Sequence, residues 1–525
     1  MKSLKNIILG LSCVSAVVLT GCIDETLPTH QATDEQLSSS SKATEALLWA
    51  MPAFANNYKT VDGGDYDWGY GSLMHIRDVM TDEMVIIESG YDHYSAWEHN
   101  QYIGPNYLST QFIWNYFWKF VQTTNNMIGA INPESASETQ LGYLGAAYGY
   151  RAFIYLDMAR MFEFLENDGT SPTNSSGNNV LNLTVPIVTE EVTEEAARNN
   201  PRVNRQEMYE FILSDLNKAE EYIPDLAVVY GLKARLYMWM EDYANAQVYA
   251  RKAIEESGAT PTTQDQWLST TSGFNDISIS SWMFGSSMQK EDDVVKSGII
   301  NWTSWMSNET TYGYAAAGPM PLADINFYNK ISDTDFRKLS WKAPAGSVLE
   351  GKNTYIDTAT GAALPEYASL KFRPGSGNMS DFNVGSACSY PMMRVEEMYF
   401  IEAEAAAQQN PAQGVNLLND FMSNYRDPQY KCTKSSKEDV VKEIVFQKRV
   451  ELWGEGQSFF DIKRLNLPVT RGYAGTLHHT IGRFNTTTRP AWMNFCIVRS
   501  EGNNNTALVG FENPDPSDVY SSWAE

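Results

Sequence analysis

The chain has 525 residues, 43% hydrophobic and 20% charged, which is an ordinary composition for a globular protein with a large core. Its 64 acidic and 39 basic residues give a formal net charge of −25, which opposes binding to nucleic acid and to anionic membrane surfaces. No C-x-x-C or H-E-x-x-H spacing occurs, so we expect neither a transition-metal site nor a cofactor.

Residues 1–21 have the pattern of a bacterial lipoprotein signal peptide. Lys2 and Lys5 precede an apolar run too short to span a bilayer, and the run ends in Leu19-Thr20-Gly21-Cys22. This is the form of a lipobox, in which Cys22 is acylated, for example with palmitate, and becomes the first mature residue. Two or more acyl chains anchor a protein durably, since each buried methylene adds about 0.8 kcal/mol. The alternative is an ordinary secretory signal whose cysteine carries no lipid.

Residues 22–41 are polar and poor in aliphatic side chains, which predicts a flexible tether that ends at a helix start near Ser41. The next feature is the stretch 62–69 (DGGDYDWG), which places Asp62, Asp65 and Asp67 close together. Such spacing is similar to a calcium-binding loop, although the closing Glu of an EF-hand is missing. A turn rich in Asp and Gly is the competing interpretation.

The stretch 88–107 (ESGYDHYSAWEHNQYIGPNY) is rich in aromatic rings among polar side chains. Tyr91, Tyr94 and Trp97 are three apart, so on a helix they would form one stripe of the kind that packs in a core. The glycines, Pro105 and the polar residues in every gap favour an exposed binding loop instead. Tyr107, beside the next helix, is assigned to the core.

Helical patterns dominate the rest of the first half. Residues 110–131 are apolar all round and stop at Asn132-Pro133, and residues 138–165 form a second long helix before a loop at 167–180. The segment 230–253 places bulky and small residues at the offsets of a tetratricopeptide (TPR) helical hairpin. The residues at these offsets are Tyr230, Ala234, Tyr237, Ala246 and Ala253.

The helical pattern breaks at about 258–390 and returns at 391–466. The return consists of a helix, a turn at Asn410-Pro411, a second helix, and a third from about 437 to 452. The tail 467–525 is irregular. We therefore expect one domain over 42–525, with a helical scaffold at about 42–257 and 391–466 and a loop-rich insertion at about 258–390. Cys388, Cys432 and Cys496 form no disulfide framework; they are either one pair and a free thiol or buried free thiols.

Three segments resemble the SusD/RagB family of surface nutrient-binding lipoproteins of Bacteroidetes. They are Cys22-Ile23-Asp24-Glu25, PMMRVEEMYFIEAEAA at 391–406 and EIVFQKRVELWGEGQSFFDIKRLN at 443–466. In the last segment Glu451, Gly456, Asp461 and Arg464 match the family pattern. We interpret its alternating charges, together with Arg394 and Glu397, as structural ion pairs rather than as catalytic groups.

The resemblance implies a mostly α fold built on TPR-like hairpins, with the ligand surface carried by the early aromatic segment and by the insertion. Aromatic rings can cover the apolar face of a sugar while amides and carboxylates bond its hydroxyl rim. The matching segments here are 88–102 and 302–314. The expected ligand-binding residues are Trp97, Asn100, Tyr102, Trp302, Trp305 and Tyr312, followed by Tyr91, Asp92 and His93.

By the same resemblance, the protein would be lipid-anchored in the outer membrane and face the cell exterior. It would bind an oligosaccharide or polysaccharide without catalysing a reaction, and would pass it to a SusC-like TonB-dependent transporter. Two alternatives remain: a surface glycoside hydrolase, which needs two opposed carboxylates, and a TPR adaptor that binds only protein.

Overall fold

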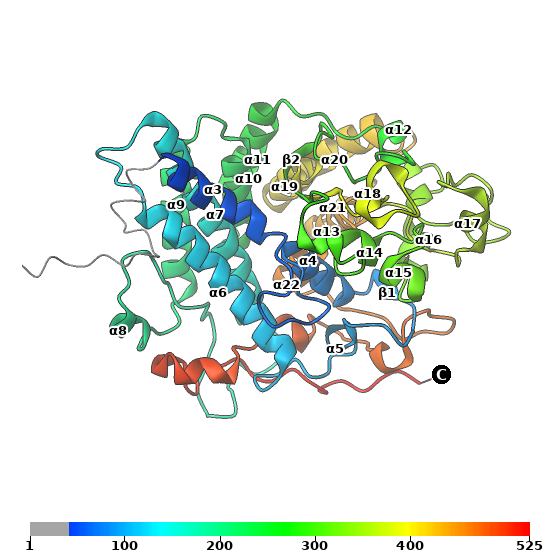
Figure 1. Ribbon diagram of the computed structural model, residues 1–525. Coiled ribbons are helices and arrows are strands. Elements are labelled where there is room, and N and C mark those ends of the chain that lie inside the picture. Colours follow the sequence, from blue (N-terminus) through cyan, green and yellow to red (C-terminus); the bar gives the residue numbers. More distant parts are fainter. Residues whose placement is uncertain (1–40, 525) are drawn as a thin grey trace, which may run out of the picture.

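The computed structural model describes residues 41–524, apart from the side chain of Ser41 (Figure 1). The signal peptide 1–21, Cys22 and all but the last residue of the expected tether lie outside the described residues. Among the residues that are described, no helix combines the length and apolar character needed to cross a membrane.

Long helices occupy residues 41–257 and 395–464. Buried positions repeat at helical spacing along them, so each helix packs one or more faces into a common core. The longer helices are α3 (Ser41–Phe54), α4 (Tyr70–Val79), α6 (Leu108–Gly129), α7 (Glu138–Phe162), α9 (Arg205–Tyr222), α10 (Ala227–Trp239), α11 (Tyr243–Ser257), α19 (Val395–Gln409), α20 (Pro411–Tyr425), α21 (Lys437–Glu451) and α22 (Ser458–Arg464).

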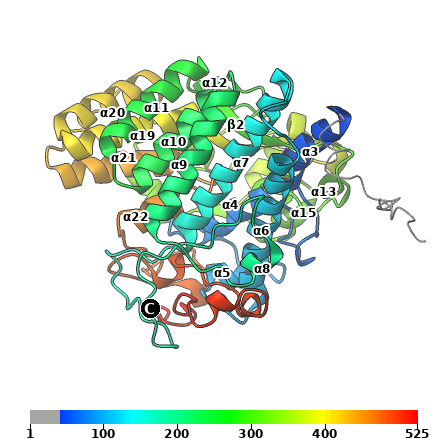
Figure 2. The ribbon, with the colours of Figure 1, turned by 90° about the vertical axis from the view of Figure 1, so that its left-hand side faces the viewer.

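The scaffold is a layer of neighbouring helices. Figure 2 shows α7, α9, α10, α11, α19, α20 and α21 side by side, and the chain contacts follow the same order. The predicted TPR-like hairpin is confirmed as α10 and α11. Ala234, Ala246 and Ala253 are fully buried, which allows the helices to approach closely, and Asp242 caps the start of α11. Proteins with this arrangement bury a continuous core between successive hairpins.

The structure differs from the predicted helices mainly at their ends. Helix α6 begins and ends two residues earlier than expected, while α7 begins at Glu138 as expected because Ser137 and Gln140 form a capping box. Residues 391–394 belong to a strand, although the sequence suggested that a helix starts there. Their side chains are buried on both faces, a pattern that does not distinguish strand from helix.

Two short antiparallel strand pairs tie the insertion to the scaffold. β1 (Met84–Ile86) pairs with β3 (Pro321–Ala323), and β2 (Trp282–Ser287) pairs with β4 (Ser389–Arg394). Short helices fill the connections. They are α5 (Ser95–Glu98), α8 (Glu194–Ala197), α12 (Gln264–Trp267), α13 (Asp293–Lys296), α14 (Trp302–Met306), α15 (Gly313–Ala317), α16 (Ile325–Lys330), α17 (Thr358–Ala363) and α18 (Phe382–Gly385).

A buried ion cluster joins the insertion to the helices. The Glu451 carboxylate at the end of α21 pairs with Arg337 of the insertion at 3.0 Å, Arg394 of β4 at 3.1 Å and Arg426 after α20 at 2.7 Å. Burial alone would raise the pKa of Glu451, but the three guanidinium groups outweigh it and hold that pKa well below its usual range. Removing one partner from such a cluster leaves buried charges unpaired.

The three mature cysteines Cys388, Cys432 and Cys496 are buried free thiols, which decides between the two alternatives left by the sequence.

We predict that Glu451→Gln destabilises the protein by about 3–5 kcal/mol near neutral pH, because three buried arginines lose their shared anion. Glu451 has a lowered pKa when folded, so its stabilisation is present above the unfolded pKa of about 4.3 and is lost as pH falls below it. Urea unfolding between pH 7 and 3 measures both effects, and the wild type should lose stability on acidification more steeply than the variant.

The matched control is Glu438→Gln on the same helix, where the Glu438–Lys442 pair is exposed and should contribute little to stability. Equal effects of the two substitutions would show that the buried cluster is not what joins the insertion to the scaffold.

Candidate functional site

The β1–β3 ladder brings the two aromatic segments together. Ile86 lies opposite Pro321, and the backbone N–H of Ile87 donates to the carbonyl of Met320 at 3.2 Å. Because the pairing is antiparallel, the chain that leaves β1 runs beside the chain that enters β3. The segment 88–94 therefore meets the α14–α15 segment, as the family resemblance implied.

The meeting point is lined by rings and one carboxylate. The His93 ring packs edge-on against Tyr314 at 5.0 Å and Trp305 at 6.0 Å between centroids, and Trp305 stacks on Tyr314 at 4.2 Å. Tyr91 stands beside them in sequence and has 58% of its surface exposed. We call the set Lys59, Asp65, Tyr91, His93 and Tyr314 the junction surface; Tyr314 is its buried member, with 7% of its surface exposed.

Asp65 links three parts of the chain: its own loop with Lys59, the 88–94 segment through His93, and α15 through Tyr314. Its carboxylate pairs with Lys59 at 2.8 Å and with His93 at 3.6 Å, and it accepts a hydrogen bond from the Tyr314 hydroxyl. Burial would raise the pKa of Asp65, but the hydrogen bonds from Lys59 and Tyr314 outweigh it, so this pKa is lowered. The carboxylate is therefore ionised at neutral pH and holds the loops in place.

The prediction that Trp97, Trp302 and Trp305 offer exposed faces is wrong, because each has only about 1% of its surface exposed. Trp97 sits in α5 and packs against Tyr66 and Tyr94. Trp302 stacks on Tyr390 at 4.9 Å. Polar neighbours did not show which way each ring points, because several of them, such as Glu98, Thr303 and Ser304, are themselves buried.

Asn100 is also buried: its side-chain amide donates to the carbonyl of Pro516 at 2.9 Å, so it positions the C-terminal segment. Tyr102 is exposed and packs edge-on with Tyr107 at 5.3 Å. Tyr107 is 39% exposed, so its assignment to the core is wrong.

Tyr312 is half-buried and donates to the carbonyl of Asn378 at 3.4 Å. Asp92, also half-buried, accepts from the backbone of Tyr94 at 2.8 Å and shapes the turn that presents Tyr91 and His93.

The acidic loop at 62–67 folds as a turn. Asp67 accepts hydrogen bonds from the backbones of Val61, Asp62 and Gly63, while Asp62 accepts from Gly64 and from the Tyr66 hydroxyl. Asp65 points to the junction surface instead. The three carboxylates thus bind separate donors, and no cluster of three metal-binding side chains is found among residues 41–524.

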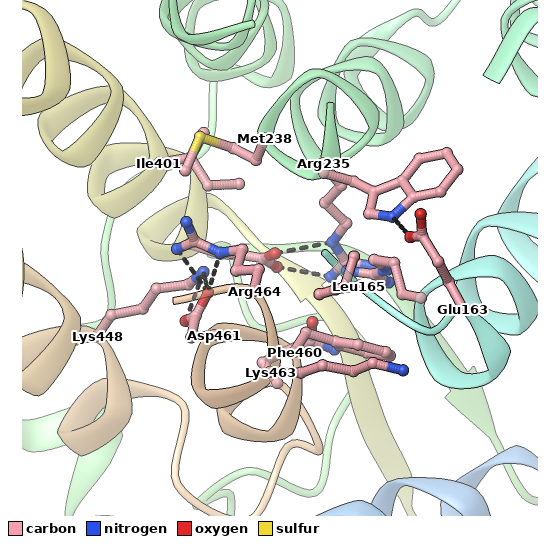
Figure 3. Close-up of a pocket in the computed structure, with 14 residues that line it drawn as sticks. Glu163, Leu165, Arg235, Met238, Ile401, Lys448, Phe460, Asp461, Lys463 and Arg464 are labelled. Carbon is pink, nitrogen blue, oxygen red and sulfur yellow. Dashed lines mark hydrogen bonds and ion pairs between the residues drawn. The ribbon is translucent and has the colours of Figure 1, made fainter. Parts of the chain in front are cut away.

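The family-like segments 391–406 and 443–466 line a small internal cavity (Figure 3). Its charged side chains are paired across it: Arg235 with Glu397 at 2.6 Å, and Asp461 with Lys448 at 3.0 Å and with Arg464 at 2.8 Å. The cavity volume is about 30 Å³, which suits one or two water molecules and excludes a sugar. The structural interpretation of these charges is therefore favoured, although most pairs join different elements rather than successive helical turns.

Sequence reasoning missed Lys59, Tyr314 and an exposed tryptophan, Trp49 on α3. Trp49 is 62% exposed. A signal for it was present: Thr44, Leu48, Met51 and Ala55 recur at helical spacing and face inward, and Trp49 lies off that stripe.

Two family models match adjoining parts of the chain. The model of the SusD family matches residues 238–508, and a model described as starch-binding and associating with the outer membrane matches residues 27–235. The chain belongs to the SusD family. The family resemblance predicted from the sequence is thus confirmed.

One relative and several solved structures are similar to this chain. SusD-like protein P38 of Formosa agariphila is 26% identical over 284 residues, a match that spans 51% of this SusD-family chain and about half (49%) of that protein. A SusD-like carbohydrate-binding protein from Bacteroides vulgatus superposes with a TM-score of 0.69 at 21% identity, covering 90% of this chain and 98% of that one. A SusD superfamily protein from Bacteroides thetaiotaomicron gives 0.65 at 20% identity, covering 90% and 99%. These structures confirm the predicted fold class, a mostly helical TPR-like fold.

We predict that Trp305→Ala lowers the free energy of unfolding by about 3–5 kcal/mol, because a buried stacked ring is lost. Tyr91→Ala, which removes an exposed ring of the junction surface, should change it by no more than about 0.5 kcal/mol. Thermal melts of the two variants beside the wild type provide the measurement. A large loss in Tyr91→Ala would show that this ring packs in the core of the junction.

Proposed function

We propose that the protein is a non-catalytic, surface-exposed lipoprotein that captures an oligosaccharide or polysaccharide and delivers it to a SusC-like TonB-dependent transporter of the outer membrane. The observation that carries the proposal is the junction surface, where two aromatic segments far apart in sequence meet in a SusD-family fold. The name of one matching family model, which refers to starch binding, supports a glycan as the ligand class.

The junction surface has the chemistry that a sugar requires. The exposed ring of Tyr91 can cover an apolar sugar face, and His93 beside it has 38% of its side chain exposed and can bond a hydroxyl. Lys59 and Asp65 are partly exposed and add a donor and an acceptor. Since Asp65 already holds these groups together, little ordering is needed when a sugar binds.

Binding without hydrolysis is supported by the state of the carboxylates. Glycoside hydrolysis needs two opposed carboxyl groups at the bond that breaks. The carboxylates of the 443–466 segment that could have served, such as Glu451 and Asp461, are buried in ion pairs. The cavity that Asp461 lines is too small for a sugar. Asp65, at the junction surface, is engaged by Lys59, His93 and Tyr314.

We predict that one or more neutral polysaccharides retard the wild type in native gels, and that Tyr91→Ala weakens this binding roughly 5- to 150-fold. The factor follows from a stacking contribution of about 1–3 kcal/mol per ring, borrowed from bases on rings. A practical panel is soluble starch, xylan, galactomannan and laminarin, with a reducing-sugar assay on the same samples.

The control is Tyr425→Ala, a tyrosine of α20 that is also partly exposed (39%) but lies on the helical scaffold. Retention by none of the four polymers would contradict glycan capture, and release of reducing sugar would favour the hydrolase.

The delivery step and the anchor rest on the sequence of residues 1–22 and on family resemblance. We predict that mild detergent extraction of the native host yields the protein together with an outer-membrane barrel, and that Cys22→Ala leaves it outside the outer-membrane fraction. Recovery of the wild type alone, with candidate barrels present in other fractions, would count against delivery. A Cys22→Ala variant that still sediments with outer membranes would count against lipid anchoring.

A further inference from the structure

A groove of about 560 Å³ lies beside Trp49, next to the junction surface. Helix α3 forms one wall with Trp49, Pro52 and Ala53, and Ile277 lies on the opposite side. The volume is within the range of sites that hold small ligands. The cavity between the family-like segments has a volume of only about 30 Å³, whereas this groove is large enough for sugar residues.

The floor of the groove is rigid. Asn56, just after α3, donates to the carbonyl of Ser287 at 2.9 Å and accepts from the hydroxyls of Ser286 at 3.0 Å and Tyr390 at 3.1 Å. These bonds join the end of α3 to β2 and β4. A floor held in this way does not have to be ordered when a ligand arrives.

The groove offers the two kinds of surface that a carbohydrate needs. Trp49 is 62% exposed and Ile277 is 48% exposed, so an apolar wall faces solvent. Gln289 and Asp293 lie exposed on the rim and supply amide and carboxylate hydrogen-bonding groups. Trp49 lies off the inward-facing stripe of α3, so its ring is available for contact with a ligand.

Charge narrows the class of ligand. Of the described residues that line the groove, only Asp292 and Asp293 are charged, and both are negative. Like charges brought close together repel, so polymers with carboxylate or sulfate groups are disfavoured here. The negative charge of the groove therefore favours a neutral polysaccharide.

The groove and the junction surface share one loop. Asn56, Tyr58 and Thr60 line the groove, whereas Lys59 and Asp65 belong to the junction surface. Figure 1 shows α3, α13, α14 and α15 in a row, and Figure 2 shows α3, α13 and α15 along one edge of the molecule, so both sites lie on the same face. We propose that the Trp49 groove is a second binding site for a neutral polysaccharide, and that one chain lies across it and the junction surface. This inference rests on the proposed function.

The test uses the full mature chain and native gels containing soluble starch, xylan, galactomannan or laminarin. On the polymer that retards the wild type, Trp49→Ala should weaken binding roughly 5- to 150-fold, the range expected for one stacked ring. Trp49→Phe, which keeps a flat ring, should retain most of the binding. Phe511→Ala removes a partly exposed ring of the C-terminal tail and serves as the control. Melting temperatures check that each variant is folded.

The outcomes separate the two proposals. If Tyr91→Ala weakens binding but Trp49→Ala leaves it unchanged, the second site is wrong and glycan capture stands. If the wild type binds none of the four polymers, glycan capture itself fails and the groove proposal fails with it. If polygalacturonate retards the wild type and Trp49→Ala abolishes that retention, the choice of a neutral chain is overturned.

Discussion

The shared anion Glu451 is the interaction on which the arrangement of the parts depends. It meets arginines from the insertion, from β4 and from the end of α20, so the loop-rich block and two helices are held at one buried point. Arg394 also reaches Glu455 at 2.9 Å, and Lys371 pairs with the same carboxylate at 2.7 Å. Buried charges of this kind are costly unless each is paired, so the cluster forms as a whole or not at all. Correct docking of the insertion is therefore coupled to correct packing of α20 and α21.

The positions of the junction surface and of the Trp49 groove follow from this docking. With the insertion in place, the β1–β3 ladder sets α15 beside Tyr91 and His93, and the β2–β4 pair sets the groove floor against the end of α3. The family-like signature segments stabilise the interior, whereas the proposed binding residues lie outside these segments. This division explains why the most recognisable residues of the chain are not its proposed binding residues.

The scaffold could be predicted from sequence because helical periodicity and small residues at fixed offsets report directly on packing, as at Ala234 and Ala246. The candidate site could be predicted only as two regions. Trp97, Trp302 and Trp305 share polar neighbours with exposed Tyr91, yet short helical turns direct their rings inward. That choice is made by tertiary contacts such as Trp302 on Tyr390, which join residues almost 90 positions apart. For Trp49, the stripe of inward-facing residues along α3 was enough to predict that the ring is exposed.

We propose that ligand binds the junction surface and the Trp49 groove, and not the layer of helices formed by α7, α9–α11 and α19–α21. Hydrogen–deuterium exchange of the mature protein, with and without the neutral polysaccharide that retards it in gels, tests this most directly. If the ligand binds there, we expect slower exchange in residues 55–67, 88–94 and 285–293 and in the α14–α15 segment, with α9, α10 and α11 unchanged. Protection confined to α9–α11, or to the 443–466 segment, would contradict it.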